Sequence, residues 1–337
     1  MTEPPVEGFS GPPVASGSFA ASGSRSAVPR VLAERARDLS DGRLTPAVPR
    51  DAATVILLRQ GAGPGSGAGA GVEAFLLRRT AELDFAPGAC VFPGGSVDER
   101  DADPGIGWVG PAPEDFAAQL DVPPERARAL VCAAIRETFE ESGVLLAGPA
   151  GDGASVVGAG MMSAGLASAG LASAGLVSDS AALAADRHAL LTGTTTFGEV
   201  LGRQGLVLRT DLLTPWARWI TPEVSPRRFD TWFFAAALPA GQTATAAPEG
   251  HADPGESESG TWLRPGAALD AAQAGEITLL PPTAVTLREL AAHQDVDGIL
   301  ARRMTITPRL PRVIVEDGKV RLSMPRLDQA ESGEEHP

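Results

Sequence analysis

The feature that most constrains this chain is a cluster of glutamates in residues 134–145, which read AIRETFEESGVL. Glu137, Glu140 and Glu141 are spaced i, i+3 and i+4, which on an α-helix places their carboxylates on one face. Like charges at this spacing repel, so the arrangement favours a neutralising cation. Carboxylate oxygens suit a hard divalent ion such as Mg2+ or Mn2+. A solvated acidic helix face is the alternative interpretation of the triplet alone.

The residues around the triplet predict one long helix. Pro123, Pro124 and Glu125 are typical of a helix start, where proline fits the first turn and an acidic side chain faces the positive end of the helix dipole. We expect the helix to run to Ser142 and to end at Gly143, a natural C′ residue. The triplet then lies in the last turns, where the negative end of the helix dipole also favours a cation.

A second segment lies upstream of this helix. Residues 91–101 read VFPGGSVDERD, and a Pro-Gly-Gly turn after an apolar run lets the backbone approach a ligand or an ion closely. Together the two segments resemble the Nudix box, in which a glycine is followed by five residues, a glutamate, seven residues and then Arg-Glu-aliphatic-any-Glu-Glu-any-Gly-aliphatic. The matching residues are Gly95, Arg136, Glu137, Glu140, Glu141, Gly143 and Val144.

The chain departs from that pattern in three respects. Asp101 stands at the place of the first glutamate, and Thr138 stands where an aliphatic residue is usual. Residues 102–135 form a spacer of 34 residues in place of seven, so 27 residues are inserted. Such a split box is known in the Nudix branch that resembles the peroxisomal acyl-coenzyme A diphosphatase. Similarity to that branch extends over roughly residues 50–315 and includes residues 74–95, 216–234 and 279–283.

The resemblance implies a fold and a reaction. The fold is α/β, a Nudix-type α/β/α sandwich with a mixed β-sheet. The reaction is metal-dependent hydrolysis of a diphosphate linkage in coenzyme A or acyl-coenzyme A, which gives a phosphopantetheine product and adenosine 3′,5′-bisphosphate. The box predicts the diphosphate but says little about the rest of the ligand. Nucleotide sugars, dinucleotides and dinucleoside polyphosphates therefore stay open as substrates. A catalytically silent nucleotide-binding regulator is the alternative from another class.

The same resemblance assigns roles to the box residues. Glu137 and Glu141 are expected to bind Mg2+ or Mn2+ directly, with Glu140 and the Gly95 carbonyl as further ligands. Arg136 is expected to orient the carboxylates through a salt bridge. Hydrolysis of a diphosphate develops charge on the phosphate oxygens, so positioning and electrostatics supply most of the catalysis.

Other polar residues are candidates for binding substrate and for acting as the general base. Arginines bind phosphates well, and adjacent residues of a strand face opposite ways. The arginines predicted to bind substrate are Arg78, Arg79, Arg227 and Arg228. The general base is undetermined; the candidates beside the box glutamates are Glu256 and Glu258, while Asp98 and Asp101 could assist the metal through water. No zinc spacing links His188, His251, His293 and His336.

Local patterns predict the element order of the domain. Residues 1–48 are expected to be a disordered leader with a short helix over 31–39, residues 49–325 the domain with insertions at 102–128 and 147–185, and residues 326–337 an acidic disordered tail. Strands are predicted at 52–59 and 72–79, as a hairpin at an edge of the sheet, and at 216–220, 229–238 and 262–263. Helices are predicted at 195–204 and 281–293, and a hairpin with an Asp-Gly turn at 313–322.

Composition limits the partners and the compartment. A net charge of −14 argues against a nucleic-acid binder, so a small-molecule diphosphate is the expected partner, and a homodimer is allowed. Three SAGL repeats in residues 163–177 lack charge, but without flanking aromatic or basic anchors they indicate a low-complexity insertion, not a membrane span. Cys90 and Cys132 are expected to be buried thiols, and no signal peptide is visible, so a cytoplasmic location is predicted.

Overall fold

The computed structural model describes residues 30–61, 71–80, 88–149, 177–246, 257–303, 305–316 and 319–323. The helices are α1 (Arg30–Ser40), α2 (Pro113–Leu120), α3 (Pro124–Ser142), α5 (Ala181–Leu191), α6 (Phe197–Gln204), α7 (Pro265–Ala274), α8 (Pro281–Leu290) and α9 (Val296–Leu300), with 3₁₀ turns η1 (Glu99–Ala102) and η2 (Thr210–Leu212). The strands are β1 (Arg50–Gln60), β2 (Val72–Arg79), β3 (Ala89–Val91), β4 (Gly94–Ser96), β5 (Trp108–Val109), β6 (Ala147–Pro149), β7 (Leu206–Arg209), β8 (Thr214–Ile220), β9 (Phe229–Ala237), β10 (Ser257–Leu263), β11 (Thr278–Leu279), β12 (Pro308–Arg309), β13 (Arg312–Glu316) and β14 (Lys319–Ser323).

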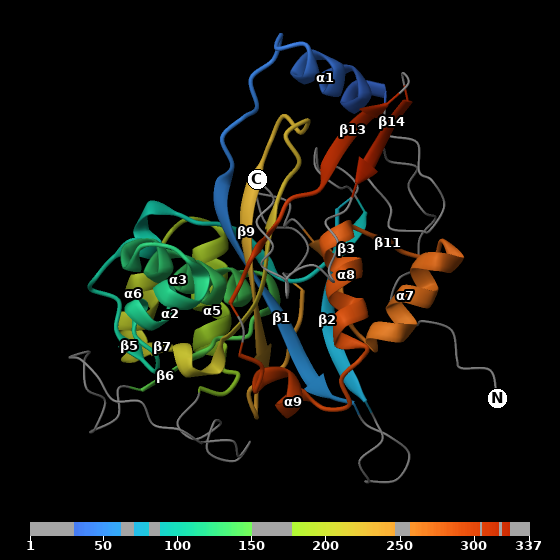
Figure 1. Cartoon of the computed structure of the whole chain (residues 1–337). Coiled ribbons are helices and arrows are strands. Elements are labelled where there is room, and N and C mark those ends of the chain that lie inside the picture. The colour runs from blue at the N-terminus through green and yellow to red at the C-terminus, as the bar shows by residue number, and fades with distance from the viewer. Residues whose placement is uncertain are drawn as a thin grey trace, which may run out of the picture.

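The long strand β1 organises a mixed sheet through the middle of the molecule (Figure 1). The strand order is β11-β3-β2-β1-β9-β8-β12, with β10 added to β2 and β4 added to β1. β1 runs parallel to β9 and antiparallel to β2 and β4. The predicted hairpin of β1 and β2 is confirmed, but its predicted place at an edge is wrong. β9 pairs with the other side of β1, and β10 pairs with β2.

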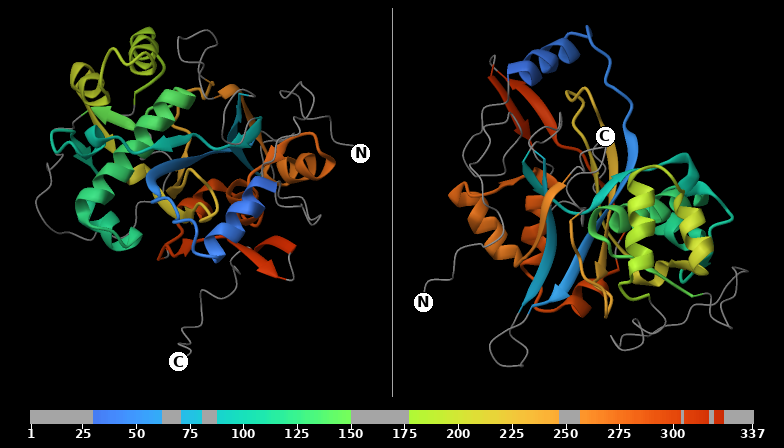
Figure 2. Two further views of the ribbon diagram at one scale, coloured as in Figure 1. Left: turned by 90° about the horizontal axis from the view of Figure 1, so that it is seen from above. Right: turned by 180° about the vertical axis from the view of Figure 1, so that it is seen from behind.

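Both faces of β1 are buried, which explains its continuous apolar sequence. Ala53, Val55 and Leu57 belong to one hydrophobic cluster, whereas Ile56 and Leu58 belong to another, as the alternation of a strand requires. Helices α2, α3, α5 and α6 lie on one side of the sheet, and α7 and α8 lie on the other (Figures 1 and 2). The expected α/β/α sandwich with a mixed sheet is therefore confirmed.

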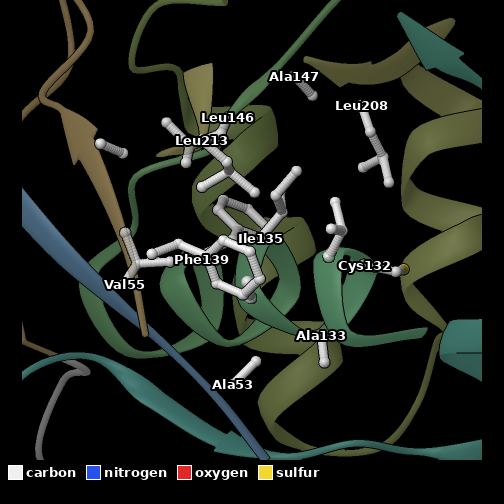
Figure 3. Packing of buried hydrophobic residues seen from close by; sticks show 14 of the residues in the cluster. Ala53, Val55, Cys132, Ala133, Ile135, Phe139, Leu146, Ala147, Leu208 and Leu213 are labelled. Carbon is white, nitrogen blue, oxygen red and sulfur yellow. The ribbon is translucent and has the colours of Figure 1, made fainter. Parts of the chain in front are cut away.

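Helix α3 has the predicted bounds. It begins at Pro124, and Gly143 ends it with φ +75°, the left-handed conformation that glycine adopts without strain. Its buried face packs on β1, and Figure 3 shows Ile135 and Phe139 of α3 in the same cluster as Val55. Burial of one such large apolar side chain contributes about 1.5–3 kcal/mol, so the helix is held firmly against the sheet.

Most of the other predicted elements are present. The predicted helix at 195–204 is α6, where Thr196 and Glu199 form a capping box. The strands β8, β9 and β10, the helix α8 and the hairpin of β13 and β14 also lie where the sequence predicts them. The short leader helix is α1, and the Asp-Gly turn at 317–318 lies outside the described residues.

The two predicted insertions contain regular structure in their described parts. The first carries β5, α2 and the start of α3, and the second begins with β6 and includes the first half of α5. Strand β7 joins β5 and β6 into a small sheet of its own. The SAGL repeats up to residue 176 and the tail at 326–337 lie outside the described residues. In the described part of the chain, no helix is long and apolar enough to span a bilayer.

Candidate functional site

The two segments that resemble the halves of a box meet where β4 packs against α3. The backbone N–H of Gly94 donates to Oε2 of Glu141 at 2.7 Å. A Cβ added at Gly95 would stand 2.6 Å from the carboxylate of Glu137, so only a glycine fits there without displacing that side chain. β4 is held in this place by its pairing with β1, where Gly95 lies opposite Ala53. The long spacer thus loops out and leaves the two segments in contact.

Arg136 joins the two segments through its guanidinium. Nε and Nη2 each donate to one oxygen of Asp101 at 2.9 Å, and Nη2 also donates to the backbone carbonyl of Ser96 at 2.9 Å. On the other side, Nη1 donates to Glu137 at 2.8 Å and to Glu140 at 3.3 Å. Arg136 therefore forms ion pairs with Asp101, Glu137 and Glu140. The first of these partners is the aspartate that replaces the usual glutamate.

The carboxylates of the triplet are held at an energetic cost. Burial raises the pKa of Glu137 to about 7, and the charge of Glu140 adds to this rise while Arg136 opposes it. Burial also raises the pKa of Glu140, again against the effect of Arg136. One arginine therefore does not neutralise the cluster fully, and a further cation would relieve the repulsion. The donors are all oxygens, which fits Mg2+ or Mn2+.

The three carboxylates do not converge on one point. Among the described residues, no group of three His, Cys, Asp or Glu side chains has the geometry of a metal site. Arg136 lies between Glu137 and Glu140, while Glu141 is turned to the backbone of Gly94. The chemistry and burial of the donors nevertheless fit a divalent ion.

The two aspartates near the glycine turn have structural partners. Asp98 caps η1 by accepting from the N–H of Arg100 at 2.8 Å, and its pKa is lowered chiefly by the Arg100 side chain. Asp101 is 2% exposed and also accepts from the N–H of Asp98 at 2.8 Å. Of the candidate bases, Glu256 lies outside the described residues, and Glu258 is described only by its backbone, at an irregularity in the pairing of β10 with β2.

The four predicted substrate arginines are not gathered together. Strand alternation places Arg79 on the face of β2 that carries Phe75 and Leu77 toward α3, and Arg78 on the opposite face. Arg228 is buried and donates to two backbone carbonyls, those of Thr221 and Ala47, at 2.9 and 2.8 Å. Its guanidinium therefore has a structural role in addition to the predicted binding of a phosphate. The neighbouring Arg227 is exposed.

Sequence reasoning missed a buried arginine behind the triplet. Arg187 of α5 donates to the backbone carbonyl of Glu140 at 2.9 Å. It comes from a helix that follows the repeats, and no motif in its own sequence marks it. Of the histidines in the described residues, His188 lies on α5 and His293 packs edge-on against Trp216.

Comparison with known proteins supports the resemblance to the Nudix family. The family model described as "NUDT19 Nudix domain" matches residues 111–290. The chain is 30% identical over 278 residues to the acyl-coenzyme A diphosphatase NUDT19 of Gallus gallus, covering 74% of this chain and 70% of that protein. The Homo sapiens protein of the same name is 28% identical over 249 residues, covering 66% of this chain and 61% of that protein.

A solved structure supports the fold. The crystal structure of a NUDIX hydrolase from Alicyclobacillus acidocaldarius matches with a TM-score of 0.55 and 23% sequence identity. The match covers 77% of this chain and 98% of that one. Since the identity is low, the likeness concerns the arrangement of helices and strands.

Proposed function

This chain belongs to the Nudix family described by the NUDT19 Nudix domain, and on that premise we propose that it hydrolyses the diphosphate of coenzyme A or an acyl-coenzyme A with Mg2+ or Mn2+. Membership makes it an enzyme that acts on a phosphoanhydride. The observation that carries the proposal is the contact of the Gly94–Gly95 turn with Glu137 and Glu141, because it brings two of the three carboxylates beside one backbone turn.

The residues that would hold the ion are Glu137, Glu140, Glu141 and the carbonyl of Gly95. Such an ion would supply positive charge against the developing charge of the diphosphate and would lower the pKa of the attacking water. Arg136 holds the carboxylates through its bonds to Asp101, Glu137 and Glu140, so they are ordered before the substrate arrives. Such preorganisation is what catalysis by positioning requires.

The proposed reaction balances as a hydrolysis. The oxygen of water forms a bond to one phosphorus, and the bond from that phosphorus to the bridging oxygen breaks. The departing phosphate keeps the electron pair of that bond, and the protons of water pass to the base and to solvent. The products would be a phosphopantetheine compound and adenosine 3′,5′-bisphosphate. Among the four arginines, Arg79 is the one we favour for the substrate phosphates, because it shares the α3 face of the sheet.

A substrate panel tests this function. Coenzyme A, acyl-coenzyme A, nucleotide sugars, dinucleotides and dinucleoside polyphosphates are incubated with Mg2+ or Mn2+, and products are identified by mass. Release of adenosine 3′,5′-bisphosphate from coenzyme A compounds is the expected result. Turnover of nucleotide sugars alone would keep the enzyme and reject coenzyme A. Turnover of none would leave a nucleotide-binding regulator as the better explanation.

Two variants of α3 test the site. Glu141→Gln is expected to lower kcat at least about 100-fold, since it removes a charge that the cation needs. Glu125→Gln is the matched control, because this exposed glutamate lies in the first turn of the same helix. If Glu141→Gln keeps full activity, the ligand assignment is wrong.

Location and assembly belong to the same proposal. The two free, buried cysteines suit a reducing compartment, which supports the cytoplasm. A homodimer remains part of the proposal, and sedimentation of the purified chain would decide it. Fractionation of the source cells would decide the location.

A further inference from the structure

The end of α3 that carries the triplet is capped by groups from two distant segments. The last carbonyls of a helix lack donors within the helix and must find them elsewhere. The carbonyl of Glu140 accepts from Nε of Arg187 at 2.9 Å, and the carbonyl of Ser142 accepts from the N–H of Thr245 at 2.8 Å. The turn that carries Glu140 and Glu141 is thus tied to α5 and to the segment after β9.

Arg187 is itself fixed tightly. Its Nη2 donates to the carbonyl of Thr245 at 3.0 Å, and its Nη1 lies 3.4 Å from Oγ1 of the same residue. The residue is 8% exposed, and a Cβ added at Gly143 would stand 3.0 Å from Nη1. Arginine keeps its charge in proteins, so a buried guanidinium stands beside the last turn of α3.

A buried guanidinium is a costly way to end a helix. Taking a charge out of water is unfavourable, and many helices end at a glycine C′ residue without a buried charge. Here the helix already has Gly143 at that position. Arg187 therefore supplies something that Gly143 does not, namely a charged and rigidly held donor at the carbonyl of Glu140.

We propose that Arg187 is a positioning residue of the diphosphatase site, which fixes the last turn of α3 so that the carboxylates of Glu140 and Glu141 keep the orientation needed to hold the divalent ion. The inference rests on the proposed function. It also gives α5 a role, because this helix follows residues 150–176 and brings Arg187 back to the site. Outer residues of this kind typically change metal affinity or activity 10- to 100-fold when they are replaced.

The test compares Arg187→Met and Arg187→Lys with a control, Arg203→Met. Arg203 is also an arginine near α5, but its side chain is half exposed and pairs with Asp186. Mn2+ affinity is measured by electron paramagnetic resonance without substrate, and kcat and KM are measured with the substrate that the panel identifies. Arg187→Met is expected to weaken Mn2+ binding roughly 10-fold or more and to lower kcat more than it raises KM. Arg187→Lys should restore part of both, and the control should change neither.

Amide hydrogen exchange supplies a readout that does not depend on the reaction. Arg187→Met should speed exchange at residues 139–145 and leave the first turns of α3 unchanged. A folded Arg187→Met with the Mn2+ affinity, kcat and exchange rates of the parent overturns the proposal, and so does a lower Tm with unchanged Mn2+ affinity. If Arg187→Met does not fold, Arg187→Lys decides by the same measurements. If the parent binds no Mn2+ and cleaves no diphosphate, the proposed function fails, and the exchange data alone decide whether Arg187 holds the turn.

Discussion

Replacing Asp101 by asparagine would remove the charge that joins the two parts of the site while keeping the size of the side chain. Asp101 is 2% exposed and accepts two hydrogen bonds from Arg136, each 2.9 Å long. It also accepts from the N–H of Asp98 at 2.8 Å. The substitution leaves the guanidinium of Arg136, whose side chain is only 12% exposed, without one of its carboxylate partners.

The expected cost follows from these contacts. Removing one partner of a buried ion pair costs about 3–5 kcal/mol, because the remaining charge is left uncompensated. Arg136 keeps its bonds to Glu137 and Glu140, and the asparagine oxygen can still accept one hydrogen bond. We therefore expect a loss of about 2–3 kcal/mol in the free energy of unfolding. Arg136 would also shift toward the glutamates, so kcat/KM should fall about 10-fold or more.

Urea unfolding and steady-state kinetics check this prediction. Asp38→Asn is the control, because Asp38 also makes two bonds to one arginine, Arg43, but the two side chains are 45% and 59% exposed. The control should cost less than about 1 kcal/mol and leave activity unchanged. If Asp101→Asn costs no more than the control and keeps the parent's kcat/KM, the bond between Asp101 and Arg136 does not hold the site together.

Three further predictions concern the site, the thiols and the acid stability. Gly95→Ala should lower kcat/KM about 10- to 100-fold with little change in Tm, because the added methyl group would displace the Glu137 carboxylate, now 2.6 Å from that position; parent-like kinetics would contradict this. Burial raises the pKa of Cys90 to about 12 and that of Cys132 well above its usual value, so an aromatic disulfide reagent should modify neither in the folded protein at neutral pH and both in urea. Burial raises the pKa of Asp186, but hydrogen bonds from two α6 side chains outweigh this effect and lower the pKa. The stability that the charged Asp186 contributes is therefore complete above pH 3.8 and is lost as the pH falls further. Asp186→Asn should reduce the dependence of unfolding free energy on pH in that range, and an unchanged slope would refute the assignment.

Local patterns predicted much of the fold correctly. The proline start and glycine end of α3, the apolar runs of β1 and β2, and the capping box of α6 depend on residues close together in the chain. The predicted position of the β1–β2 hairpin is wrong, because pairing with β9 and β10 involves residues far along the sequence. Pairing partners at such distances leave no local pattern.

The candidate site also contains features that the local sequence predicts and features that it does not. The spacing of the triplet and Arg136 predicts their shared helix face, whereas the bond of Asp101 to Arg136 is known only from the tertiary structure. Arg228, a predicted phosphate ligand, donates to backbone carbonyls. Whether an arginine faces a substrate or its own backbone depends on which segments surround it.

The sequence by itself determines that Glu137, Glu140 and Glu141 share one helix face, because the period of a helix is a local property. Only the tertiary structure decides what stands against that face: the Gly94–Gly95 turn in front, and Arg187 behind the carbonyl of Glu140. Those contacts depend on how the sheet brings distant segments together. Burial by distant segments is also what makes the repulsion within the triplet strong, since it removes the water that would otherwise screen it.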